Sequence, residues 1–66
     1  MLYRIDNKKL FVACADVCLS VTEVVVKNAG CSAVTLQRIT KGKPVTDVTI
    51  GKISKALGIS PEAILA

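Results

Sequence analysis

The part of the sequence that decides the fold is residues 29 to 43, which read Ala-Gly-Cys-Ser-Ala-Val-Thr-Leu-Gln-Arg-Ile-Thr-Lys-Gly-Lys. Residues 29 to 31 predict a tight turn, and Ser32 can cap a helix by accepting a hydrogen bond from a free amide of the first turn. Gly42 can adopt the left-handed conformation that ends such a helix. The stretch therefore predicts a turn followed by a helix of about ten residues, ~15 Å long.

This helix has two different faces when successive residues are placed about 100° apart. Thr35, Leu36 and Ile39 fall on one side and would be buried. A helix whose other side is polar and basic can serve as the recognition helix of a helix-turn-helix, because it fits a major groove about 12 Å wide. The alternative is a solvated helix face in any small α-helical domain. The outward arc consists of Ala33, Val34, Gln37, Arg38 and Lys41.

The charge of the chain agrees with an anionic partner. Nine Lys and Arg residues against five Asp and Glu residues give a formal net charge of +4. Residues 1 to 30 carry a net charge of +1 and residues 31 to 66 a net charge of +3. The excess lies in the half that holds the candidate recognition helix, which is compatible with nucleic acid or an anionic membrane surface.

The composition indicates one small domain with an aliphatic core. The chain has 66 residues, of which 52% are hydrophobic, with one Phe, one Tyr and no Trp. Its three cysteines are accompanied by no histidine, so a metal site would need a ligand from a carboxylate or from another chain, and we expect none. We expect Cys14, Cys18 and Cys31 to act as small buried apolar residues in a reducing cytosol.

The first expected helix covers residues 7 to 18 and begins after Asp6, which can cap it. Val12 and Ala15 point away from its inner face, which indicates either a subunit interface or ordinary isolated apolar surface residues. The inner face would be formed by apolar and cysteine side chains, namely Leu10, Phe11, Cys14, Val17 and Cys18.

The second expected helix, residues 20 to 28, is locally ambiguous, because its three successive valines favour a strand as much as a helix. A cap at Ser20 or Thr22 favours a helix. So does the apolar side formed by Val21, Val25 and Ala29.

Two more helices follow the loop at Pro44. One covers residues 47 to 57, begins after the cap Thr46, buries isoleucines and a leucine, and ends at Gly58. Gly51 inside it costs about 1 kcal/mol relative to Ala and so needs a reason, for which the close approach of another helix is one candidate. A last short helix covers residues 61 to 66. The prediction is an all-α, compact bundle of five short helices, residues 1 to 66 forming a single domain in which the second and third helices make the helix-turn-helix.

Four segments follow a recognisable pattern: Lys27-Asn28-Ala29-Gly30-Cys31-Ser32, Thr35-Leu36-Gln37-Arg38-Ile39, Lys41-Gly42-Lys43 and Lys55-Ala56-Leu57-Gly58-Ile59-Ser60. They resemble the helix-turn-helix and closing helices of the lambda-repressor-like, Cro/C1-type (XRE family) DNA-binding domains. The resemblance covers residues 22 to 65, and residues 1 to 20 match only in their amphipathic pattern.

The resemblance implies a transcriptional regulator of bacterial or phage type, usually a repressor, that binds a palindromic operator as a homodimer. The implied base-reading residues are Ala33, Val34, Gln37 and Arg38. The implied phosphate-binding residues are Thr22, Ser32, Lys41 and Lys43. The first two base-reading side chains can touch a thymine methyl group but cannot form hydrogen bonds, so specific readout would rest on Gln37 and Arg38.

A pre-formed dimer would pair through the last helix, with Ile64 and Leu65, aided by the first helix. The alternative function is a protein-interaction module of the same fold, such as an antitoxin-like or co-regulator subunit, without specific DNA binding. The apolar start of the recognition helix, together with Val12 and Val24 on the back face, motivates that alternative.

Other function classes find little support in the sequence. An enzyme is not expected, because there is no histidine, no glycine-rich phosphate loop and no obvious carboxylate pair. Charged residues near the start of the chain argue against a signal peptide there. No apolar run is long enough to span a membrane. We expect a cytoplasmic protein with no cofactor and no small-molecule ligand.

Overall fold

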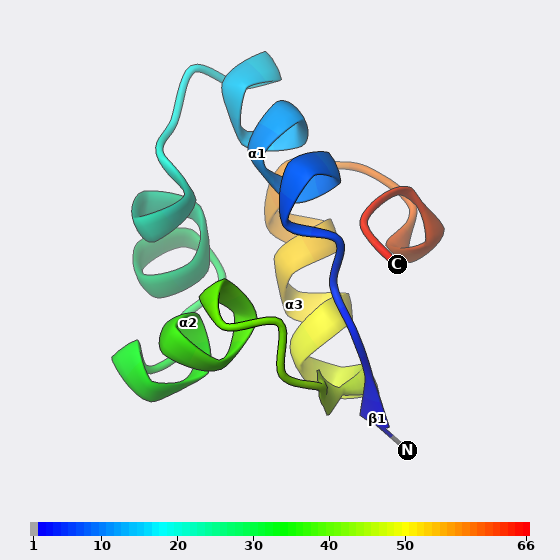
Figure 1. The fold of residues 1–66 in the computed structure, drawn as a ribbon. Coiled ribbons are helices and arrows are strands. Elements are labelled where there is room, and N and C mark those ends of the chain that lie inside the picture. Colours follow the sequence, from blue (N-terminus) through cyan, green and yellow to red (C-terminus); the bar gives the residue numbers. More distant parts are fainter. Residues whose placement is uncertain (1) are drawn as a thin grey trace.

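The computed structural model describes residues 2–66. Figure 1 shows α3 running through the middle of the molecule, with η1 and α2 to one side and η2 to the other. The elements are, in chain order, β1 (Leu2–Tyr3), α1 (Asn7–Asp16), η1 (Glu23–Asn28), α2 (Ala33–Thr40), β2 (Val45–Thr46), α3 (Asp47–Leu57) and η2 (Pro61–Ala63).

The mostly helical architecture confirms the prediction of a helix-turn-helix bundle, with two corrections. The expected fifth helix is a three-residue 3-10 turn, η2, capped by Ser60. A small antiparallel sheet, which an all-α prediction does not include, pairs Leu2 with Thr46 and Tyr3 with Val45. This sheet ties the start of the chain to the loop between α2 and α3.

One aliphatic core joins the elements, as the composition indicates. Val24, Val25 and Ile53 are fully buried, and Cys14 is 1% exposed. The buried apolar residues come from both ends of the chain as well as from every α-helix: Ile5, Leu10, Cys14, Val24, Val25, Ile39, Val45, Ile50, Ile53, Leu57 and Ile64.

The burial of Ile64 overturns the expected dimer surface at the last helix. Its side chain is 0% exposed, so it is unavailable to a partner subunit. Leu65 is half-buried and forms an isolated β-bridge with Ile5. The C-terminal segment therefore closes the core of its own subunit.

The first helix begins at the predicted cap but ends earlier than residue 18. The carboxylate of Asp6 accepts hydrogen bonds from the amides of Lys8 and Lys9, at 2.9 and 3.1 Å. Beyond Asp16 the chain turns, and Cys18 takes a left-handed conformation with φ of 59°. The amide of Cys18 donates to the carbonyl of Ala15, and that of Leu19 to the carbonyl of Cys14, which is the Schellman pattern usually completed by glycine.

Three burial predictions are wrong, and the early end of α1 explains two of them. Val17 is 40% exposed and Cys18 is exposed, because both lie beyond the helix and leave its periodicity. Phe11 is 65% exposed, since it lies about 80° around α1 from the middle of the face formed by Leu10 and Cys14.

The valine-rich segment is helical and not a strand, but its hydrogen bonds are of the π type. The amide of Ala29 donates to the carbonyl of Val24 at 2.8 Å, one residue further than in an α-helix. Ser20 is the cap, because its Oγ accepts from the Glu23 amide at 3.1 Å and donates to the Glu23 carboxylate at 3.3 Å. Val24, expected on the back face, is buried, so it cannot support a protein-interaction surface.

The fourth predicted helix, α3, has the predicted ends. The Thr49 amide donates to Thr46 Oγ1 at 3.3 Å, and Gly58 has a φ of 68°. The explanation expected for Gly51 is wrong: a methyl group placed on it would meet nothing within 4 Å. No other helix of residues 2–66 therefore approaches Gly51 closely.

Candidate nucleic-acid interface

The candidate recognition helix, α2, is fixed at both ends by local hydrogen bonds. At its start the Thr35 amide donates to Ser32 Oγ at 3.3 Å. At its end Gly42 has a φ of 75°, and its amide donates to the carbonyl of Ile39 at 3.0 Å. The Lys43 amide donates to the carbonyl of Arg38 at 2.8 Å, which completes a Schellman motif. The turn therefore holds the basic residues after α2 in one place relative to the helix.

The inner side of α2 is anchored as predicted. Ile39 is 1% exposed and belongs to the core, while Leu36 is partly buried and packs against it. Thr35 is half-buried at the margin. One fully buried side chain and two partly buried ones thus hold the helix with its other side toward solvent.

The outer side carries every residue that the sequence nominates for base reading. Val34 is 62% exposed, and the Arg38 side chain is exposed and not covered by its own subunit. The candidate phosphate-binding residues are exposed as well. The exposed candidates are Ala33, Val34, Gln37 and Arg38 for bases and Thr22, Ser32, Lys41 and Lys43 for phosphates.

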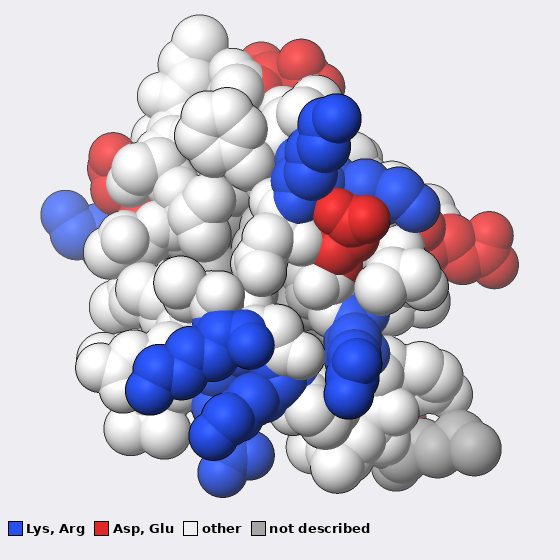
Figure 2. All heavy atoms as spheres, viewed as in Figure 1, with Lys and Arg blue, Asp and Glu red and all other residues white. Residues whose placement is uncertain are grey.

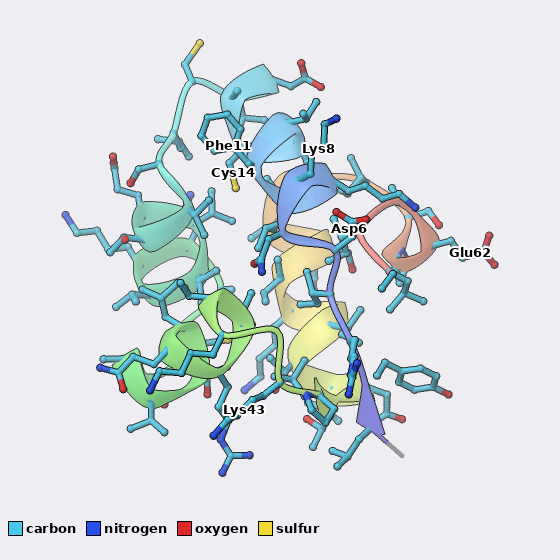
Figure 3. All side chains as sticks on the ribbon, in the orientation of Figure 1. Asp6, Lys8, Phe11, Cys14, Lys43 and Glu62 are labelled. Carbon is cyan, nitrogen blue, oxygen red and sulfur yellow. The ribbon has the colours of Figure 1, made fainter. Side chains whose placement is uncertain are left out.

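Positive charge gathers at this side of the molecule. Figure 2 shows Lys and Arg side chains over α2 and the loop after it, while the acidic side chains visible on that face lie over other parts. Arg38, Lys41 and Lys43 are the exposed basic residues of this stretch, and Figure 3 shows Lys43 beside α2. A basic surface centred on an exposed helix is the electrostatic arrangement that a nucleic-acid backbone favours.

Two of the candidate phosphate-binding hydroxyls differ in their surroundings. Ser32 Oγ is engaged as the cap of α2 and also lies 3.2 Å from Thr35 Oγ1. Thr22 makes no side-chain cap hydrogen bond, because Ser20 caps η1 in its place. The Thr22 hydroxyl is therefore the freer of the two to take a new partner.

A groove beside α2 was not foreseen from the sequence. It has a volume of about 280 Å³, and Val34 and Arg38 form its α2 side together with Thr35. Leu2, Val45, Thr46 and Thr49 form the other side, because the pairing of β1 with β2 brings the start of the chain to the recognition helix. Strands of two residues leave no readable period in a sequence, so no local signal identified Leu2, Thr46 or Thr49 as neighbours of Arg38.

The cysteines occupy three different environments and not one. Cys14 is buried, as expected, and burial raises the pKa of its thiol. Cys31 is partly buried; burial raises the pKa of its thiol, and the positive charge of Lys52 opposes that rise. Cys18 is exposed, which corrects the expectation that all three are buried.

Within residues 2–66 no three His, Cys, Asp or Glu side chains come together as a metal site would require.

Among residues 2–66, no helix has both the length and the apolar character needed to span a lipid bilayer. The longest helix, α3, covers Asp47–Leu57.

Comparison with known proteins agrees with this geometry. A family model described as the Cro/C1-type helix-turn-helix DNA-binding domain matches residues 9–66. No curated protein and no solved structure matches the chain significantly. The family match includes most of α1, which the sequence pattern alone related to the family only through its amphipathic character. Domains of this kind bind DNA and are typically non-enzymatic. The chain belongs to the Cro/C1-type helix-turn-helix DNA-binding domain family.

Proposed function

We propose that this protein is a sequence-specific transcriptional regulator, a repressor of bacterial or phage type, that inserts α2 into the major groove of operator DNA. The observation that carries the proposal is the exposed outer side of α2, with Gln37 and Arg38 pointing away from a helix that is fixed at both ends. Such a regulator acts in the cytoplasm, where its operator lies.

In this proposal bases are read from the outer side of α2. Arg38 donates two hydrogen bonds to the O6 and N7 atoms of a guanine, and Gln37 pairs with an adenine edge. Ala33 and Val34 pack against thymine methyl groups, because neither side chain has a polar atom. Two residues thus provide the polar specificity, and the shape of the DNA supplies the rest.

Phosphates are held at the two ends of α2 and at the start of η1, where Thr22 lies. Lys41 and Lys43 flank the Gly42 turn and contact the backbone on one side, and the hydroxyls of Thr22 and Ser32 contact it on the other. These contacts position the domain and carry no sequence information. A single helix offers few contacts, so the protein binds as a homodimer to a palindromic operator whose half-sites are about 34 Å apart.

Selection of bound duplexes from a random library tests the proposal directly. We expect an enriched palindromic motif. The selected site is then titrated by fluorescence anisotropy at one fixed salt concentration with the wild type, Arg38→Ala and the control Lys55→Ala. Lys55 is exposed in the last turn of α3 and loses the same charge.

Arg38→Ala should weaken binding to the selected site by ~1–3 kcal/mol and relax the preference at one base pair, which is the cost of a lost bidentate base contact. Lys55→Ala should change the affinity little and leave the motif intact. If the two substitutions weaken binding equally, or if the Arg38→Ala protein selects the same motif as the wild type, Arg38 does not read a base.

A protein-interaction module is the second candidate, and the exposed apolar side chains beside α2 favour it. Val34 and Leu2, which line the groove at α2, are 62% and 59% exposed, and such neighbouring apolar side chains are unusual on a surface that contacts only phosphates. A titration with random duplex at low salt separates the two functions. Absence of binding at tens of micromolar protein would favour the interaction module, since even non-specific DNA binding reaches about 1–100 µM.

A further inference from the structure

The outward face of α1 combines exposed apolar side chains with one charge of each sign. Phe11 and Val12 are 65% and 52% exposed, and Ala15 beside them is exposed as well. Lys8 lies one helical turn before Val12 and Asp16 one turn after it, so the three side chains share one stripe. Within residues 2–66 neither the Lys8 ammonium nor the Asp16 carboxylate has a hydrogen-bond or ion-pair partner.

The charges on α1 run against its helix dipole. Its first turn has no acidic residue and contains Lys8 and Lys9, and its last turn has no basic residue and contains Asp16. The opposite order stabilises a helix, and α3 has it, with Asp47 in the first turn and Lys55 in the last. The Asp6 carboxylate at the cap offsets the two lysines at the N-terminal end, so the unfavourable charge that remains on α1 is Asp16 at its C-terminal end.

The same face borders a groove. It lies between α1 and the part of the chain from the end of α3 through η2, and its volume is about 510 Å³. Val12, Ala13 and Asp16 line it on one side, and Ile59 and Ala63 on the other. At the rim the Lys9 ammonium donates to the carbonyl of Leu65 at 3.2 Å, so that side chain is already engaged. Lys8 and Asp16 remain as the unpaired charges of the stripe.

We propose that a second copy of this chain covers this face, with the two α1 helices antiparallel and Val12 at the two-fold axis. Lys8 and Asp16 are each four residues from Val12, so the axis brings Lys8 opposite Asp16 of the partner subunit, and the reverse contact forms by symmetry. A parallel pair would bring like charges together. In the antiparallel pair the partner's Lys8 also lies near the negative C-terminal end of α1, where it offsets the unfavourable charge of Asp16.

This surface replaces the C-terminal one that the burial of Ile64 removes from consideration. One short helix per subunit buries less than the ~1,600 Å² of a standard interface, so the dimer is weak without DNA. The inference gives a surface to the homodimer of the proposed function and in that sense rests on it. Its test uses the protein alone, so the pairing can fail while DNA binding stands.

Charge exchange provides the first test, by sedimentation equilibrium of the full chain at low salt. Lys8→Glu and Asp16→Lys should each weaken self-association about tenfold, because each turns two attractive contacts into repulsive ones. An equimolar mixture of the two variants should associate as well as the wild type, since both contacts are attractive again in the mixed dimer. Both substitutions improve the dipole arrangement of α1, so unfolding is not expected, and circular dichroism checks this.

The apolar centre provides the second test. Val12→Asp should abolish self-association, because it buries two carboxylates at the axis. Val48→Asp is the matched control, since Val48 is 63% exposed on α3 and lies outside the proposed interface, and it should associate as the wild type does. A wild type that stays monomeric up to millimolar concentration overturns the proposal. The proposal is also overturned if the equimolar mixture self-associates no better than the single variants. Equal effects of Val12→Asp and Val48→Asp on self-association would overturn it as well.

Discussion

Gly51→Ala should stabilise the protein. Gly51 lies inside α3, has no positive φ, and would meet nothing within 4 Å if it carried a methyl group. The substitution therefore changes only the backbone entropy of the unfolded chain and the local helix propensity. From these we expect the free energy of unfolding to rise by about 0.5–1 kcal/mol. In a domain of this size that corresponds to a melting temperature higher by ~2–8 °C.

Thermal and urea unfolding followed by circular dichroism measure this change. Gly58→Ala is the control, because a methyl group there also meets open space while the φ of 68° is left-handed. That variant should lose about 1 kcal/mol, the cost of a side chain in this conformation. Because the added methyl group meets open space in both variants, the difference between their stabilities reports the effect of backbone conformation and not of packing. A Gly51→Ala protein no more stable than the wild type would refute the reasoning and indicate that something outside the described subunit occupies the space beside α3.

Three further outcomes are expected. Cys18→Gly should raise the free energy of unfolding by about 1 kcal/mol in urea titrations, because Cys18 is exposed and has a φ of 59°; a loss would mean that its side chain matters. Lys43→Ala should reduce the slope of log affinity against log salt by about 1 on any duplex, measured by anisotropy, and an unchanged slope would exclude a phosphate contact. Ile53→Ala should cost ~2–5 kcal/mol in denaturant titrations, because its side chain is 0% exposed, and a loss below about 1 kcal/mol would contradict that burial.

Helix ends were the most predictable part of this fold. Ser32, Thr46 and Gly58 take the roles that their residue types indicate, since each role is satisfied by hydrogen bonds to atoms only a few residues away. Gly42 likewise ends α2 with a positive φ. Local chemistry decides such positions, so a single sequence is enough to read them.

The end of α1 was misread because the decisive conformation belongs to a residue that rarely adopts it. Cys18 occupies the left-handed position where the sequence would be expected to hold glycine. The periodic pattern of the sequence continues through Val17 and Cys18, whereas the hydrogen bonds of the structure end the helix at Asp16. The small sheet between Leu2 and Thr46 was missed for a related reason, because contacts distant in sequence leave no local pattern.

The exposed side of α2 could be derived from helical period alone, but its neighbours could not. Placing residues about 100° apart separates Ile39 from Gln37 and Arg38, and the structure agrees. That Arg38 shares a groove with Leu2 and Thr46 depends on tertiary pairing of β1 and β2. A prediction made from the sequence of α2 alone therefore leaves out the residues of β1 and β2 that line the groove with Arg38.

The way α2 is held makes stability and recognition separable in this domain. Its anchoring depends on Ile39, on the partly buried Leu36 and on the capped ends. The side chains of Gln37 and Arg38 are exposed and form no hydrogen bond within residues 2–66. Substitution of the outer residues can alter the DNA sequence that is preferred without a stability cost, since exposed side chains away from special conformations change stability little. Substitution of Ile39 would change both properties together. If the protein has the proposed function, a new operator preference is therefore accessible through Ala33, Val34, Gln37 and Arg38 while the core stays as it is.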